Sequence, residues 1–152
     1  MERQTIAMIA HDGKKADMVA FAKDHKSILS KYHIVGTGTT GGILQEKVGL
    51  PVRRMFSGPL GGDVQIASLV VEKVVQAVFF FIDPLGKHPH DPDIQTLMRI
   101  CNVHNVPLAI NPATALCIIT AMELANASLD SPAPLEDLRA RLHHSLHLNT
   151  EV

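Results

Sequence analysis

Short runs of apolar, mostly β-branched or aromatic residues alternate along this chain with longer stretches of helical periodicity. Apolar runs of this kind are typical of strands in a parallel sheet whose two faces are covered by helices. The predicted strands span residues 6–10, 33–36, 52–56, 77–82 and 107–110. The predicted helices span residues 16–31, 42–48, 64–73, 93–104 and 113–127, the last with Pro112 as its first helical residue. The alternation predicts an α/β fold: a single doubly wound five-stranded parallel sheet with helices on both faces.

The pattern changes after Asn126. A run of Ser, Asp and Pro residues at 128–134 predicts a connector, and apolar residues at 135, 138, 142 and 146 predict an appended C-terminal helix over 135–148. We therefore expect an α/β domain over residues 1–127, followed by a connector and C-terminal helical tail over 128–152.

Composition narrows the classes of function. The 152 residues carry a formal net charge of −1, so no general electrostatic field attracts nucleic acid or an anionic membrane. The longest uninterrupted apolar run, residues 77–82, is too short to span a membrane. Cys101 and Cys117 both lie in apolar stretches and form no redox motif, so we expect two small core residues and a cytoplasmic protein.

Glycine is distributed unevenly, because eight of the ten glycines fall between residues 36 and 62, mostly just after two predicted strands. The carboxyl ends of parallel strands share one edge of the sheet, where helix N-termini present free N–H groups and ligands bind. The chemistry is therefore expected in the four loops that follow the first four strands, at residues 11–15, 37–41, 57–63 and 83–93.

The second of these loops contains the pattern G-x-G-x-x-G over residues 36–41. The acidic residue that would hold a ribose about 20 residues later is missing, so a dinucleotide site is not favoured. Three hydroxyl groups inside the loop instead favour a monophosphate site, at Thr37, Thr39 and Thr40. The alternative is that the glycines only tighten a turn while the threonines cap a helix.

The remaining loops bring other polar groups to the same edge. Asp63 follows a Gly-Gly pair at the start of a predicted helix, where an N-cap is the commoner use of an aspartate. A catalytic use becomes more credible because polar side chains follow other strands too. These side chains are His11, Asp12 and Lys15 after the first strand, and Asp83, His90, Asp91 and Asp93 after the fourth. His88 and His90 suggest a zinc site, but no third ligand has diagnostic spacing, so we expect no metal.

Taken together, four ordered segments closely resemble the methylglyoxal synthase family between about residues 6 and 115. They are Ala-His-Asp at 10–12, Thr-Gly-Thr-Thr-Gly at 37–41, Ser-Gly-Pro-Leu-Gly-Gly-Asp at 57–63, and Asp-Pro-Leu with Pro-His-Asp-Pro-Asp at 83–93. The resemblance implies an enzyme of the glycolytic bypass that eliminates inorganic phosphate from dihydroxyacetone phosphate to give methylglyoxal. It also implies a homohexamer with no metal and no organic cofactor. Because each active site would hold a phosphate cage, inhibition by the product phosphate is expected as well.

The resemblance also assigns roles to individual residues. The family's general base falls on Asp63 and its acid/base histidine on His90, with Asp83 and Asp93 as supporting carboxylates. The positions that bind the substrate and its phosphate fall on His11, Asp12, Lys15, Thr37, Gly38, Thr39, Thr40, Ser57 and Gly58. The family also places an arginine from a neighbouring subunit near the phosphate, for which Arg139 and Arg141 of the tail are the candidates.

Two other functions compete with the enzyme. A related domain that ends the large subunit of carbamoyl phosphate synthetases binds regulatory ligands at the same sheet edge. A binding module has no use for a base and an acid, and both Asp63 and His90 are present, so the enzyme is preferred. An NAD(P)-dependent oxidoreductase using Arg53 and Arg54 for a 2′-phosphate would need a larger substrate domain than 152 residues allow.

Overall fold

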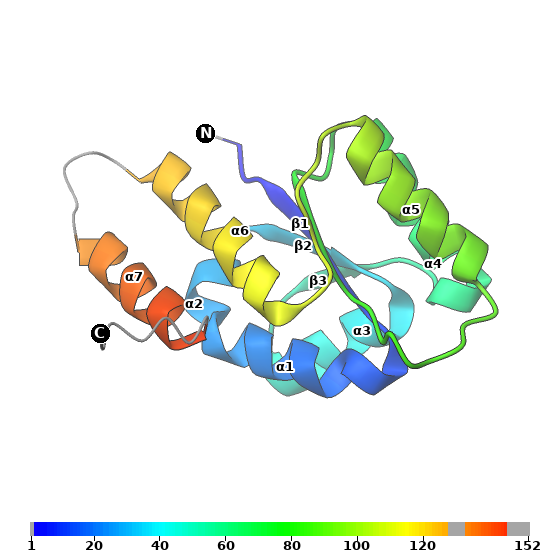
Figure 1. The fold of residues 1–152 in the computed structure, drawn as a ribbon, viewed down its shortest axis with the longest axis horizontal. Coiled ribbons are helices and arrows are strands. Elements are labelled where there is room, and N and C mark those ends of the chain that lie inside the picture. Colours follow the sequence, from blue (N-terminus) through cyan, green and yellow to red (C-terminus); the bar gives the residue numbers. More distant parts are fainter. Residues whose placement is uncertain (1, 128–132, 146–152) are drawn as a thin grey trace.

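Five parallel strands form one sheet in the order β3-β2-β1-β4-β5, with β1 at its centre (Figure 1). The computed structural model describes residues 2–127 and 133–145. The strands are β1 (Thr5–Ala10), β2 (His33–Gly36), β3 (Val52–Arg54), β4 (Ala77–Phe81) and β5 (Leu108–Ala109). Ile6 of β1 lies opposite Ile34 of β2 and Ala77 of β4. Both β1 and β4 are buried along their whole length, which accounts for their almost uninterrupted apolar sequences.

Helices cover both faces of this sheet, as the alternation of apolar runs predicts. One face packs against α1 (Lys15–Asp24), α2 (Lys26–Leu29), η2 (Leu44–Val48), which directly continues α3 (Gly38–Ile43), and α6 (Pro112–Asn126). The other face packs against α4 (Gly62–Val71) and α5 (Asp91–Val103), which lie side by side in Figure 1. Two short 3₁₀ turns, η1 (Asp12–Lys14) and η3 (Gly58–Leu60), precede α1 and α4. The predicted doubly wound α/β fold is confirmed.

The order of the strands determines where a site can form. The chain moves outward from β1 through β2 to β3 and then crosses back to place β4 on the other side of β1. The loops after β1 and β4 therefore diverge to opposite faces, and they leave a crevice between them at the carboxyl edge.

Several predicted boundaries are wrong. The expected strand 52–56 ends at Arg54: the N–H of Met55 still donates to the carbonyl oxygen of Gly36, but the side chain of Phe56 is exposed. The expected helix 16–31 is two helices separated at His25. The helix expected to begin at 42 begins at Gly38, so the glycine-rich pattern forms its first turns. Cys101 is buried as expected, whereas Cys117 lies on the exposed side of α6 and is not a core residue.

The tail contains α7 (Ala133–Ser145), which begins two residues before the predicted helix 135–148, at the end of the predicted connector 128–134. Leu142 packs against the cluster of buried residues on the α1 and α6 side of the sheet, and Figure 1 draws α7 beside α6 and α2. The connector at 128–132 and the end of the predicted helix at 146–148 lie outside the described residues. The division of the chain at residue 127 stays a prediction. None of the described helices is long and apolar enough to cross a membrane.

Candidate active site

A cavity of about 270 Å³ lies at the carboxyl edge of the sheet, in the crevice between the loops after β1 and β4. Nine of the residues singled out from the sequence line it: His11, Asp12, Lys15, Thr37, Thr39, Gly58, Asp63, Asp83 and His90. The loops after β1, β2, β3 and β4 thus meet at one place, as their position after parallel strands predicts.

Asp63 lies at the bottom of this site, in the first turn of α4, with an exposed fraction of 0%. The expectation that it caps the helix is wrong, because the N-cap residue is Gly61 and the carboxylate is turned inward. The glycines before it permit this arrangement. A Cβ on Gly62 would lie 1.9 Å from the carbonyl oxygen of Phe56, so only glycine lets α4 start this close to the chain leaving β3.

His90 is the nearest basic side chain to this carboxylate. It is the N-cap residue of α5, and its Nε2 lies 3.5 Å from Oδ2 of Asp63. Burial raises the pKa of Asp63 above its ordinary value, the neighbouring Asp93 raises it further, and His90 and His88 oppose this rise. A raised pKa makes the Asp63 carboxylate a stronger base than a solvated aspartate.

His11 follows β1 and stands beside this pair. The backbone N–H of Asp83 donates a hydrogen bond to its Nδ1 at 2.9 Å, so in the neutral ring the proton is on Nε2. Burial lowers the pKa of His11 to about 4, and repulsion from His88 and His90 adds to this effect. His11 is therefore a neutral imidazole with one N–H donor beside the cavity.

Lys15 supplies one positive charge of the site, and Lys87 also lines the cavity. Its Nζ donates to the carbonyl oxygen of Ala10 at 2.9 Å and to Oδ1 of Asp12 at 2.8 Å, which fixes the ammonium group at the end of β1. The hydrogen bond from Lys15 lowers the pKa of Asp12, whose side chain is exposed. A fixed ammonium group beside hydroxyl groups is suited to an anionic substrate.

The threonines after β2 divide into two kinds. Thr37 and Thr39 line the cavity, whereas Thr40 is buried behind it. The hydroxyl of Thr40 accepts a hydrogen bond from the N–H of Ala10 and donates one to its carbonyl oxygen, at 3.2 and 3.3 Å. Thr40 thus holds α3 against the end of β1.

Three other predicted site residues do not line the cavity. Gly38 packs against the backbone of residues 55–57, Ser57 is the N-cap residue of η3, and Asp93 lies in the first turn of α5. The cavity in turn includes seven residues given no substrate role by the sequence: Ile9, Ala10, Gly13, Pro59, Phe80, Lys87 and His88. Lys87 and His88 lie in a loop already singled out for its histidines, but its sequence does not indicate which side chains face inward.

The buried side-chain polar atoms without a hydrogen-bond partner gather in this one place. Among the described residues they are His11 Nε2, both carboxylate oxygens of Asp63, His88 Nε2 and His90 Nδ1. Buried polar atoms normally have partners, so a group of unsatisfied atoms around one cavity indicates a site arranged for a polar ligand. No group of three or more His, Cys, Asp or Glu side chains suited to a metal ion occurs in the described parts of the chain.

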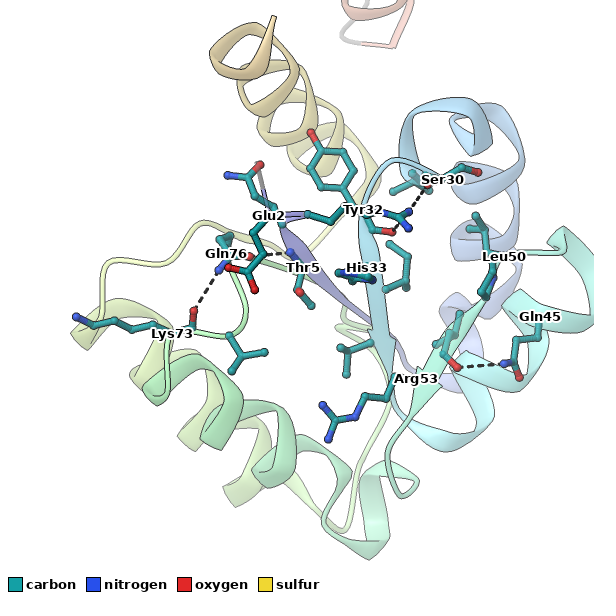
Figure 2. Close-up of a pocket in the computed structure, with 18 residues that line it drawn as sticks. Glu2, Thr5, Ser30, Tyr32, His33, Gln45, Leu50, Arg53, Lys73 and Gln76 are labelled. Atoms are coloured by element: carbon teal, nitrogen blue, oxygen red, sulfur yellow. Dashed lines mark hydrogen bonds between the residues drawn. The ribbon is translucent and has the colours of Figure 1, made fainter.

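A larger depression, of about 1230 Å³, lies at the opposite edge, around the amino ends of β1, β2 and β3 (Figure 2). Many of its polar side chains serve the fold: Arg3 donates to the carbonyl of Lys31, Gln45 to that of Val52, and Gln76 to that of Lys73. It contains none of the unsatisfied buried atoms described above. Its size therefore does not make it the better candidate.

Comparisons with known proteins identify relatives that match most of this chain. A family model described as "MGS-like domain" matches residues 17–110. The chain is 53% identical over 124 residues to methylglyoxal synthase of Ralstonia nicotianae, covering 82% of this chain and 92% of that protein. It is 54% identical over 114 residues to an uncharacterized protein of Synechocystis sp., covering 75% of this chain but 26% of that protein.

A solved structure is similar as well. The crystal structure of methylglyoxal synthase from Elizabethkingia anophelis matches with a TM-score of 0.73 and 44% identity, over 77% of each chain. The matched segment of the family model spans the loops after β2, β3 and β4, and thus Thr37, Asp63 and His90.

Proposed function

The chain belongs to the methylglyoxal synthase family of MGS-like domains, and from this premise we propose that it converts dihydroxyacetone phosphate to methylglyoxal and inorganic phosphate. The observation that carries the proposal is the buried Asp63 carboxylate, which has no hydrogen-bond partner and lies 3.5 Å from His90 in a cavity that also contains Lys15. Such a base, with an anion site beside it, fits a phosphorylated substrate that must lose a proton from carbon.

The first step is removal of a proton from the hydroxymethyl carbon. Asp63 takes this proton, the electron pair of the C–H bond forms a double bond to the central carbon, and negative charge develops on the former ketone oxygen. His90, and the Nε2–H of His11, are the donors available to that oxygen. A neutral His11 suits this task because it stabilises the enediolate without giving up its proton to the substrate.

The second step is elimination of phosphate. The hydroxyl on the former hydroxymethyl carbon loses its proton, and this carbon becomes the aldehyde. The double bond moves so that it joins the central carbon and the phosphate-bearing carbon. The C–O bond to phosphate breaks, and its electron pair leaves with the phosphate. The resulting enolate takes up a proton at its terminal carbon and gives methylglyoxal. The C–O bond to phosphate overlaps the π system of the enediol only when it stands out of the enediol plane. The phosphate must therefore be held on one side of that plane.

Lys15, Thr37 and Thr39 supply the contacts that hold the phosphate. The Lys15 ammonium and the two hydroxyls face the same cavity as Asp63, and Gly58 lets the backbone of η3 approach as well. These donors also stabilise the charge on the departing phosphate. Thr40 supports this arrangement through its hydroxyl, and Gly38 and Ser57 through the backbone. The N–H of Asp83 orients His11, and Asp93 helps raise the pKa of Asp63.

The decisive experiment measures phosphate and methylglyoxal released from dihydroxyacetone phosphate by the purified protein, with Asp63→Asn as the matched control. Equal release of both products, lost in the variant, is expected. Phosphate binding without turnover in the parent protein would contradict the enzyme and favour the regulatory module. Inhibition by added phosphate, competitive with substrate, is expected because the product occupies the same donors.

We also propose that the protein acts as a homohexamer in the cytoplasm. Exposed apolar side chains near the site support a subunit contact, since Phe56, Leu60 and Leu85 are 63%, 73% and 94% exposed. Light scattering should give the mass of six subunits of 16.5 kDa each. A species of one subunit at assay concentration would contradict this state without affecting the assignment of Asp63.

A further inference from the structure

His88 takes no part in the steps above, yet its ring lies directly on that of His11. The two ring centroids are 3.6 Å apart and the planes differ by 21°, which is a stacked arrangement. Both rings border the cavity, and the Nε2 atoms of both are buried without a partner. The stack thus joins a residue without an assigned role to one that faces the substrate.

The loop before His88 is built to accommodate this stack. A Cβ on Gly86 would lie 3.0 Å from both Cε1 and Nε2 of His88. A larger residue at position 86 would therefore press on the ring and displace it from His11. The spacing of Gly86 and His88 gives the imidazole the room that it needs.

The ring of His11 is fixed on three sides. The N–H of Asp83 binds its Nδ1 at 2.9 Å, Phe80 contacts it edge-on at 5.1 Å between ring centroids, and His88 covers one face. The Asp83 contact fixes which nitrogen carries the proton, and the two rings fix the plane. Without His88, one face of the imidazole would lose its only stacked neighbour among the described residues, and water would reach it.

Charge reinforces this geometry. The titratable or charged groups around His11 are Lys15 from α1, His88 and His90 from the loop before α5, and the carboxylates Asp12 and Asp83. A proton on His11 would meet the ammonium of Lys15 and the stacked ring of His88. It would also place an N–H on Nδ1, against the N–H of Asp83.

We propose that His88 is a positioning residue that holds His11 as the neutral tautomer with its Nε2–H aimed into the cavity. This inference rests on the proposed function, in which His11 donates to the substrate oxygen. His88 acts through His11 and takes no proton from the substrate.

The test compares His88→Ala with His88→Phe, which keeps a flat ring over His11 but carries no charge. His88→Ala should lower kcat about tenfold, because His11 loses its fixed orientation. In the plot of kcat/KM against pH, the acid limb of His88→Ala should move about one pH unit upward, since an exposed His11 imidazole protonates more readily. His88→Phe should keep most of the activity, and its acid limb should lie between those of the parent and His88→Ala, because a ring still covers His11 but the repulsion from His88 is gone. His104→Ala, an exposed histidine at the end of α5, is the control and should change neither.

Nitrogen-15 NMR of the histidine rings provides a readout that needs no turnover. In the parent, His11 should remain the Nε2–H tautomer down to about pH 5, and in His88→Phe it should do so down to a slightly higher pH because the repulsion from His88 is lost. In His88→Ala, it should titrate at higher pH. Identical His11 signals and identical pH profiles in all three proteins would overturn the proposal. If the parent released no methylglyoxal but His88→Ala still changed the titration of His11, the proposed function would fail while the coupling of the two rings stood.

Discussion

At the scale of single residues, the most consequential feature is a carboxylate placed where folding alone would not place it. Asp63 is fully buried, and neither of its oxygens has a hydrogen-bond partner. An unsatisfied buried charge lowers stability, and the same lack of solvation makes the group a stronger base. The buried Asp63 carboxylate therefore lowers the free energy of unfolding and at the same time makes the site more reactive.

Asp63→Asn separates these two effects. The amide has no charge to bury, so the melting temperature should rise by a few degrees, which is about 1 kcal/mol for a chain of this size. Turnover should fall by about 10³-fold or more because the base is gone, with little change in KM. Calorimetry and steady-state kinetics on the same preparation measure both. A variant that lost activity together with stability would indicate a structural role instead.

Gly58 provides a second prediction at this scale. A Cβ there would lie 2.7 Å from Nε2 of His90 and 3.4 Å from Oδ2 of Asp63. Gly58→Ala should displace the imidazole and lower kcat about 10- to 100-fold, while the fold tolerates it because a side-chain end can move. Circular dichroism would check the fold, and Gly61→Ala, where a Cβ meets nothing within 4 Å but φ is +97°, is the contrasting variant. Gly61→Ala should lower stability more than it lowers kcat.

The sequence reveals some of these residues but not their geometry. Asp63 and His90 can be identified because their motifs lie after predicted strands. The stacking of His88 on His11 cannot, because it depends on how the loop after β4 folds back over the end of β1. Spacing alone also favours the wrong role for Asp63, since an aspartate after Gly-Gly is indistinguishable from an N-cap until its burial is known.

At the scale of elements, α3 illustrates packing that overrides local preference. Gly41 and Gly42 are poor helix formers, at about 1 kcal/mol each relative to alanine. Both are nevertheless helical, and the side chain of Arg54 lies across them. Cβ atoms at these two positions would come within 2.8 and 3.0 Å of that side chain, so glycine is needed there. Arg54 also donates from Nε to the carbonyl of Gly38 at 3.0 Å. The sequence predicts Gly41 in the loop 37–41 and Gly42 at the start of the helix 42–48, whereas both lie inside α3 and leave room for the side chain of Arg54 from β3.

The tail helix offers a prediction of its own. Arg141 of α7 donates to the carbonyl of Asp24 at 3.0 Å and lies 3.1 Å from Nδ1 of His25, at the junction of α1 and α2. Arg141→Ala should lower the melting temperature by a few degrees, and kcat should stay unchanged because α1 reaches the active site at its other end. Arg139→Ala, at an exposed position of the same helix, is the control for stability. A large loss of kcat in either variant would instead support an arginine that reaches a neighbouring subunit.

At the scale of the whole molecule, the strand order is what makes the site possible. The alternation of apolar runs predicts five parallel strands, but it does not predict that β4 lies beside β1. This neighbour relation brings Asp83 within hydrogen-bond distance of His11, although the two are far apart in sequence. The pairing of strands that are distant in sequence is a property of the assembled sheet. Sequence patterns therefore identify the loops but not which loops lie next to each other.

Stability should depend on pH through the same contact. The pKa of His11 is about 4 in the folded chain and 6.5 in the unfolded chain, so between these values only the unfolded chain is protonated at this position. The contribution of neutral His11 to the free energy of unfolding is fully present above pH 6.5. It is lost as the pH falls toward 4, by up to about 3 kcal/mol. Asp63, with its raised pKa, acts in the opposite direction. Urea unfolding should therefore show that the free energy of unfolding falls more between pH 7 and pH 5 in the parent than in His11→Gln. An equal fall in the two proteins would contradict the buried neutral state of His11.

The two ends of the α/β unit meet on the side away from the catalytic edge. Nδ2 of Asn126, at the end of α6, donates to Oε1 of Gln4, just before β1, at 2.8 Å. A unit whose ends adjoin can be inserted into or appended to another protein without stretching its sheet or covering its substrate entrance. In the Synechocystis relative, the part that matches this chain is 26% of the protein. Gene fusion is thus open to this fold because the entrance and the ends lie at opposite edges.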